Sequence, residues 1–134
     1  MILSYSKENC EKYNFPEKIL NHIKKHTIRE DKNKRWKVGM TIQHYAMNPR
    51  NGGKQFATGR CFYLSDVFID PFNDNVIITR TLKPHCGEVI KLNGIESLNQ
   101  FAINDGFESW AQMKSYFDSP FIGRIIYFNE TEAV

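Results

Sequence analysis

Residues 22–39 bring together basic, hydroxyl and aromatic side chains that could act together in ligand binding or catalysis. They hold seven Lys or Arg and two acids, a formal charge of +5, whereas the whole chain carries +3 and the remaining residues therefore sum to −2. A basic stretch on a mildly acidic body gives an oriented field that attracts a polyanion to one face. The segment predicts a contact with nucleic acid; the alternative is a solvated loop.

Aromatic and imidazole side chains lie in and beside this segment. Trp36 and Tyr45 could stack on a nucleobase, as aromatic residues do beside a basic groove. His26 and His44 could exchange a proton near neutral pH, although an isolated histidine is more often a hydrogen-bonded structural residue. These residues extend the predicted contact from charge alone to stacking and proton transfer.

Length and composition are those of one soluble globular domain spanning residues 1–134. The 134 residues are 41% hydrophobic and 25% charged. No apolar run approaches the roughly 20 residues that cross a bilayer, and the first residues lack a signal peptide's apolar segment. We therefore expect a cytoplasmic protein with no membrane partner; its oligomeric state cannot be predicted from these properties.

The three cysteines, Cys10, Cys61 and Cys86, are odd in number and far apart. This pattern argues against a disulfide framework and is typical of a reducing compartment. His85 is adjacent to Cys86, but no second pair such as C-x-x-C completes a four-ligand zinc set. We therefore expect neither a metal site nor a bound cofactor.

Hydrophobic periodicity predicts an α+β protein. The expected elements are a helix over 15–23, strands over 40–46, 56–69, 76–80 and 88–92, helices over 95–102 and 107–117, and a central strand over 121–128. Strands and helices do not alternate, which favours a curved, mostly antiparallel sheet or small β-barrel with flanking helices.

Local signals refine these elements. Gly59 predicts a β-bulge, and Gly106 fits the left-handed position that ends a helix. Glu108 fits the first turn of the next helix better than Ser109 fits its cap, and Trp110 has the spacing of a core residue. Residues 30–35, 47–55 and 83–87 are expected to be loops, and the acidic residues after 128 a frayed tail.

Three features together resemble the ASCH domains of the PUA-like superfamily of β-barrels. They are Lys24-x-x-Thr27-Ile28-Arg29 after a helix, the turn Arg35-Trp36-Lys37-Val38-Gly39 that opens a strand, and Phe101-Ala102-x-x-Asp105-Gly106-Phe107-x-x-Trp110 before the last strand. The resemblance spans roughly residues 15–128. It implies a PUA-like fold that binds RNA or a nucleotide in a cleft between the early basic segment and the barrel.

One branch of this family, the small bacterial amidohydrolases, deacetylates N4-acetylcytidine with a Lys, a Thr and a carboxylate. Lys24, Thr27 and Arg29 match the K-x-x-T-I-R motif of that branch, and Asp105 matches its carboxylate, which is Glu in the amidohydrolases. His22 stands where the family usually has Gly. The resemblance therefore implies that Lys24, Thr27 and Asp105 are catalytic.

Amide hydrolysis places demands on these groups. The Thr27 hydroxyl is inert unless a base takes its proton, and Lys24 could do so if burial and the charges of Arg29 and Lys25 lower its pKa. Asp105 would pass a proton to the leaving amine or hold Lys24, although a close carboxylate raises the pKa of a lysine. The residues expected to contact RNA or a nucleotide are Lys25, His26, Arg29, Arg35, Trp36, Lys37 and Tyr45.

Two other interpretations stay open. Lys24 and Asp105 could form a structural ion pair, with Thr27 packed in a strand and Arg29 binding phosphate. The chain could also be a protein-interaction or regulatory module with no nucleic-acid ligand. The interpretations differ in whether Lys24, Thr27, Arg29 and Asp105 meet in one pocket.

Overall fold

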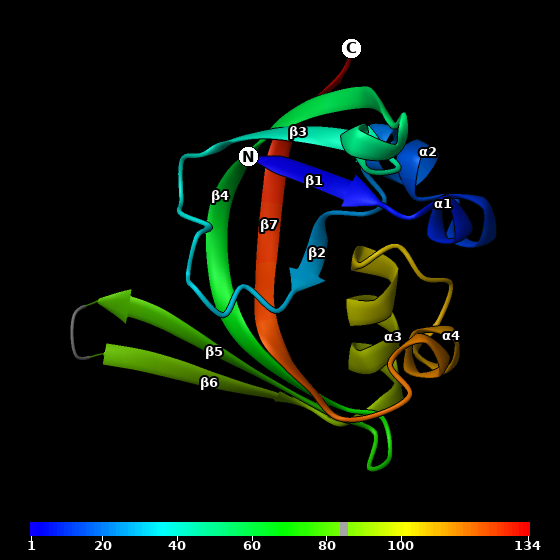
Figure 1. Ribbon diagram of the computed structural model, residues 1–134. Helices are drawn as coiled ribbons and strands as arrows, with labels where there is room; N and C mark the ends of the chain where they lie inside the picture. Colours follow the sequence, from blue (N-terminus) through cyan, green and yellow to red (C-terminus); the bar gives the residue numbers. More distant parts are fainter. Residues whose placement is uncertain (84–85) are drawn as a thin grey trace.

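The computed structural model describes residues 1–83 and 86–134, and in this part of the chain one seven-stranded sheet is accompanied by four α-helices (Figure 1). The strands are β1 (Ile2–Tyr5), β2 (His26–Arg29), β3 (Thr41–Ala46), β4 (Lys54–Asp70), β5 (Asn75–Lys83), β6 (Cys86–Leu92) and β7 (Phe121–Ala133). The helices are α1 (Lys7–Tyr13), α2 (Phe15–Leu20), α3 (Ile95–Asn104) and α4 (Trp110–Tyr116), with a 3-10 turn at Pro49–Asn51. The predicted α+β class is confirmed.

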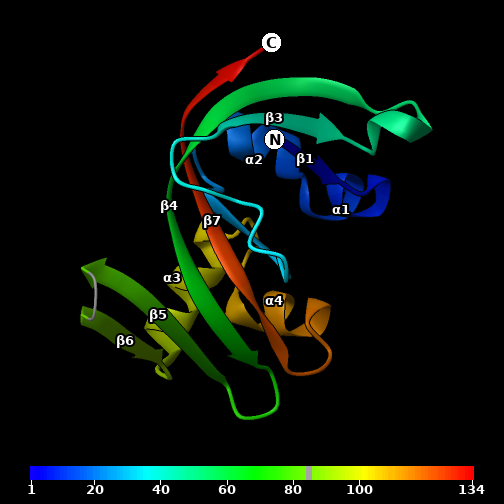
Figure 2. The ribbon, with the colours of Figure 1, turned by 60° about the vertical axis from the view of Figure 1, so that its left-hand side comes forward.

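The sheet is mixed and mostly antiparallel. β1 pairs with β3 in parallel, and the other pairings between described strands are antiparallel, in the order β1-β3-β4-β5-β6 with β7 joining β4 to β2. β4 and β7 run side by side as two long, curved strands (Figure 2). No backbone pairing within residues 1–83 and 86–134 joins β1 to β2, so the sheet is not closed there.

β4 bends where its register with β7 shifts. One shift lies between Thr58 and Arg60, as predicted for a bulge at Gly59. A Cβ at Gly59 would lie 3.2 Å from both the Asn129 carbonyl oxygen and His44 Nε2. The absent side chain therefore lets β4 pass close to β7 and β3 while it bends.

The core lies between the sheet and the helices. α3 and α4 pack together on one side of the β4–β7 ribbon (Figure 1), where Leu98, Phe101, Trp110 and Met113 are buried. The prediction that Trp110 is a core residue is confirmed. β7 pairs with a strand on each side, as expected of the central strand.

Ser109 caps α4, contrary to the prediction. Its Oγ accepts a hydrogen bond from the Gln112 N–H at 3.2 Å, which satisfies one free donor of the first turn. Glu108 lies before the helix and pairs instead with Lys18, its Oε1 being 2.7 Å from Nζ. The capping hydrogen bond, rather than the acidic charge, sets where the helix begins.

Both ends of the chain contain structure that was not predicted. β1 has only four residues and pairs with β3, far along the chain. α1 begins at Lys7 and is capped by Ser6, whose Oγ accepts a hydrogen bond from the Asn9 N–H. The expected frayed tail is wrong, because β7 continues to Ala133, which pairs with Ala57 of β4. Non-local pairing stabilises these ends.

α2 ends at Leu20, three residues earlier than predicted. The N–H groups of Ile23 and Lys24 both donate to the Lys18 carbonyl, at 2.8 and 3.0 Å, and His22 has a φ of +60°. Glycine adopts this backbone conformation without strain, whereas it is uncommon for a residue such as histidine. The turn directs the chain from α2 into β2.

Part of the predicted loop over 83–87 is strand, since β5 extends to Lys83 and β6 begins at Cys86. Its residues 84–85, and with them the His85 side of the His85–Cys86 pair, lie outside the described residues. Among the described helices, none is both long enough and apolar enough to cross a membrane.

Candidate functional site

A cavity of about 650 Å³ opens at the unpaired seam between β1 and β2. Lys24, Thr27, Arg29 and Asp105, the residues singled out by the resemblance, all line it. The remaining walls combine polar residues with six aromatic ones, the buried Tyr5, Phe15 and Phe107 and the more accessible Tyr116, Phe117 and Phe121. The fold thus brings two segments about 80 residues apart in sequence into one pocket.

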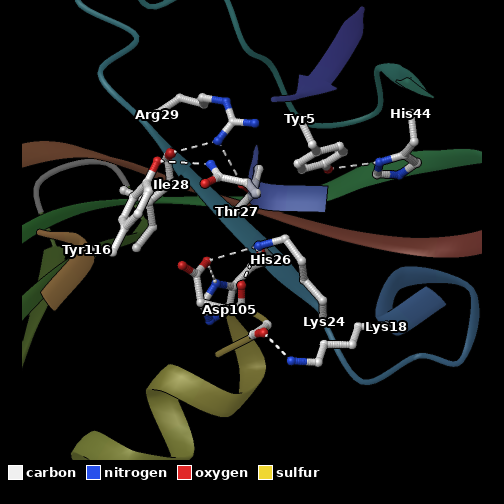
Figure 3. A network of polar contacts seen from close by, with 12 residues as sticks. Tyr5, Lys18, Lys24, His26, Thr27, Ile28, Arg29, His44, Asp105 and Tyr116 are labelled. Carbon is white, nitrogen blue, oxygen red and sulfur yellow. Dashed lines mark hydrogen bonds and ion pairs between the residues drawn. The ribbon is translucent and has the colours of Figure 1, made fainter. Parts of the chain in front are cut away.

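Lys24 is buried at the base of this cavity, with 1% of its surface exposed. Its Nζ donates to the His26 carbonyl at 3.0 Å and to the Asp105 carbonyl, and it lies 3.5 Å from Asp105 Oδ1 (Figure 3). Its Nζ also lies 4.4 Å from the centre of the Phe15 ring. Burial lowers the pKa of Lys24 to about 8, an effect that Asp105 opposes and Arg29 reinforces.

Asp105 directly follows α3 and caps its C-terminus, and it is also buried. Its Oδ1 lies 3.0 Å from His26 Nδ1. Gly106 follows with a φ of +99°, and a Cβ there would lie 2.8 Å from Phe15 Cε1 and 2.9 Å from Lys24 Cδ. Gly106 therefore permits both the helix end and the close approach of Lys24.

Arg29 holds Thr27 in the cavity wall (Figure 3). Its Nη1 donates to Thr27 Oγ1 at 2.9 Å and to the Ile28 carbonyl at 3.0 Å, and its Nη2 donates to the Ser4 carbonyl at 3.1 Å. The guanidinium therefore spans the seam from β2 to β1. No hydrogen bond joins Thr27 to Lys24 among the described contacts, although both side chains line the same cavity.

Tyr5 is a cavity residue that sequence reasoning missed. Its hydroxyl lies 3.0 Å from His44 Nδ1, and both side chains are buried. Burial, with the charges of Lys24 and Arg29, lowers the pKa of His44 to about 4, so His44 is neutral at pH 7. The alternation of Ile2-Leu3-Ser4-Tyr5 is the one sequence signal that could have indicated this short strand.

Several residues predicted to contact RNA do not line the cavity. Trp36 is buried in the core with 6% of its surface exposed, so its ring is covered where stacking on a base was expected. His26 is also buried, and its ring faces Asp105 from behind the cavity. Tyr45 is half-buried on β3, outside the residues that line the cavity.

The basic residues divide into two sets. Arg29 belongs to the cavity, whereas Lys25 is exposed beside it. Arg35 and Lys37 are exposed on the connection from β2 to β3, of which no residue after Glu30 lines the cavity. The basic segment is therefore not one continuous binding edge.

That connection is held by Asp31. Its carboxylate accepts the backbone N–H of Arg35 at 2.8 Å and of Trp36 at 3.3 Å, and lies 2.5 Å from Arg124 Nη1. Burial alone would raise the pKa of Asp31, but these hydrogen bonds and the Arg124 charge hold it below its usual value. The clamp fixes the buried Trp36 and leaves the neighbouring cations in solvent.

The described residues contain no cluster of three or more His, Cys, Asp or Glu side chains able to hold a metal ion. The chain matches no protein-family model, no curated protein and no solved structure.

Proposed function

We propose that this chain is an ASCH-like amidohydrolase that removes the acyl group from an N4-acylated cytidine-like nucleoside. The observation that carries the proposal is that Lys24, Thr27, Arg29 and Asp105 line one cavity. The curved, mostly antiparallel sheet with flanking helices supports kinship with the PUA-like fold. The proposed reaction follows from the resemblance of the motifs, and the cavity is the proposed location of that reaction.

The shape of the site favours a small ligand over a long RNA strand. A volume of about 650 Å³ falls within the usual range for small-molecule pockets, and aromatic walls suit a flat nucleobase. Glu30 and Asp118 also line the cavity, and their negative charge disfavours binding of a ligand that carries phosphate groups. We therefore assign the nucleoside to the cavity and give the exposed cations of the β2–β3 connection no part in the reaction.

Lys24 is the base in the proposed reaction. With a pKa of about 8, about a tenth of Lys24 is neutral at pH 7, far more than for an ordinary lysine. Neutral Lys24 takes the hydroxyl proton of Thr27, and the Thr27 oxygen then attacks the acyl carbonyl carbon. Because no hydrogen bond joins Lys24 to Thr27 among the described contacts, this transfer passes through a water molecule or follows a shift of the two side chains on substrate binding.

The remaining steps restore the site. Arg29 stabilises the negative charge that develops on the carbonyl oxygen, and the bond between this carbon and the N4 nitrogen breaks. The nucleobase amine takes the proton held by Lys24 and leaves. Water then hydrolyses the acyl-threonine ester, which releases the carboxylic acid and returns Thr27 to its hydroxyl form.

The test is incubation of the protein with N4-acetylcytidine and detection of cytidine. We expect turnover by the unchanged protein and its loss in Thr27→Val, which keeps the β-branched shape but removes the hydroxyl. Thr41→Val, an exposed threonine at the start of β3, is the matched control and should retain full activity. Absence of turnover, or equal turnover by all three proteins, would remove the proposal.

Binding without chemistry is the second candidate, favoured by the missing hydrogen bond between Lys24 and Thr27. In that case the cavity binds the nucleoside, Lys24 and Asp105 serve as a structural pair, and no cytidine forms. Calorimetric titration with cytidine and with N4-acetylcytidine distinguishes this case from a module without a nucleoside ligand. Binding that weakens steeply with salt would instead indicate phosphate contacts and an RNA ligand.

A further inference from the structure

His26 lies behind the cavity and contacts two of its charged residues, Lys24 and Asp105. It is 3% exposed and does not line the cavity, and its ring packs against Phe101 and Tyr127, each with a centroid distance of 5.3 Å. Its Nδ1 lies 3.0 Å from Asp105 Oδ1, while its carbonyl accepts from Lys24 Nζ. An ionised carboxylate only accepts hydrogen bonds, so beside an ionised Asp105 the hydrogen lies on Nδ1.

Two backbone carbonyls occupy two of the positions around Lys24 Nζ. A neutral Lys24 amine donates its two hydrogens to the carbonyls of His26 and Asp105. Its lone pair then occupies the third position around the nitrogen. In the ammonium form the same position carries the third hydrogen. Asp105 Oδ1 lies 3.5 Å from Nζ, beyond the 2.7–2.9 Å of a strong charge-assisted bond.

We propose that His26 is a positioning residue, which draws Asp105 Oδ1 onto its own Nδ1–H and so keeps this oxygen from closing onto Lys24. The lone pair of Lys24 is then left for the cavity. This role rests on the proposed function, in which Lys24 acts as a base. The contacts themselves are present whether or not the chain catalyses that reaction.

The other charges around these groups act in defined directions. Lys24 faces Asp105, Arg29, Lys18, Tyr5 and His44, but of these only Asp105 carries a negative charge at pH 7. Lys18 is tied to the Gly106 carbonyl and Glu108 at 2.7 Å each. Behind its ring, His26 faces Tyr127 and, across a second cavity of about 310 Å³, Arg80. Asp105 is therefore the one negative group among these that opposes the effect of burial on Lys24.

The experiment is an NMR titration of the lysine side chains, with the Lys24 signal assigned by its loss in Lys24→Met. His26→Phe keeps an aromatic ring but removes the donor, so Asp105 should close onto Lys24 and raise its titration midpoint by about one pH unit. His26→Asn places an amide donor near the position of Nδ1 and should stay close to the unchanged protein. Tyr127→Phe, on the other side of the ring, should not shift the midpoint.

An unchanged or lowered midpoint in His26→Phe, or an equal rise in His26→Asn, would overturn the proposal. Thermal unfolding checks that each variant folds, and His26→Leu replaces His26→Phe if the larger ring is not accommodated. The titration does not depend on turnover. If the Lys24 midpoint rises in His26→Phe but the unchanged protein releases no cytidine, only the proposed function is contradicted. If the unchanged protein releases cytidine but the midpoint does not move, only the role of His26 is contradicted.

Discussion

Arg29 Nη1 donates to Thr27 Oγ1 at 2.9 Å while Nη2 of the same guanidinium reaches the Ser4 carbonyl on the facing strand. One side chain thus fixes the candidate nucleophile and bridges the seam at which the cavity opens. Lysine cannot make both contacts, because its single nitrogen lacks the planar fork. The position of the Thr27 hydroxyl therefore depends on how β1 and β2 are placed relative to each other.

Arg29→Lys should consequently lower kcat/KM for N4-acetylcytidine by about 10-fold to 100-fold, although charge is conserved. Arg35→Lys, a change of the same kind on the exposed β2–β3 connection, should leave kcat/KM unchanged. Steady-state kinetics on the two variants make the comparison. Equal activities would mean that the fork of Arg29 has no role in turnover.

The pH dependence of stability should reveal the burial of Lys24. Its pKa of about 8 lies below the unfolded value near 10.4, so between these values the unfolded chain binds more protons and the free energy of unfolding rises with pH. Urea denaturation from pH 7 to 10 measures this, and subtracting the profile of Lys24→Met removes the other titrating groups. A difference that is flat or falls with pH would contradict a lowered pKa.

Asp31→Asn should lower the free energy of unfolding by about 1–3 kcal/mol, because Arg124 loses its anion while the asparagine shape is kept. Asparagine also tolerates the φ of +44° at this position. Since the pKa of Asp31 is lowered in the fold, its contribution is present above the unfolded value near 3.9 and is lost as the pH falls through the folded value.

Urea denaturation at pH 7 measures this loss. Glu30→Gln supplies the control, because Glu30 is exposed and its nearest pairing, to Lys32, is 3.9 Å long. It should change stability by less than about 0.5 kcal/mol. Similar losses in both variants would show that the Asp31–Arg124 pair is not a clamp.

Gly106→Ala should impair both folding and activity. The added Cβ would meet Phe15 and Lys24 at 2.8 and 2.9 Å, and the φ of +99° strains any side chain. Gly39→Ala is matched for backbone strain, with a φ of +94°, but its Cβ meets nothing within 4 Å. Thermal unfolding and kcat/KM should therefore show a larger loss at Gly106, and equal effects would show that the contact with Lys24 is unimportant.

Local patterns predicted much of the fold. β3, β4, β7 and α3 follow from alternation and helical spacing within single segments, and the bend at Gly59 follows from the residue type. β1 and the end of β7 did not, because they are stabilised by partners distant in sequence. Where tertiary pairing supplies the hydrogen bonds, a short segment leaves only a weak local signal.

The site was predictable only in part. The resemblance selected Lys24, Thr27, Arg29 and Asp105, which do line one cavity, but charge and residue type did not indicate that His26 and Trp36 are buried. The imidazole faces Asp105, and the indole is packed in the core beside an anchored loop. Residue type alone does not indicate which way a side chain points, so the orientations of His26 and Trp36 could not be predicted from the sequence of this segment.

Adjacent Lys24 and Lys25 allow the most direct test of the account, because the first is buried in the cavity and the second is exposed. The measurement is the rate of cytidine release from N4-acetylcytidine by the unchanged protein, Lys24→Met and Lys25→Met. Lys24→Met should lower kcat/KM by about 100-fold to 10,000-fold, as expected for loss of a general base, while Lys25→Met should match the unchanged protein. Release of cytidine at the same rate by all three proteins, or by none of them, would contradict the account.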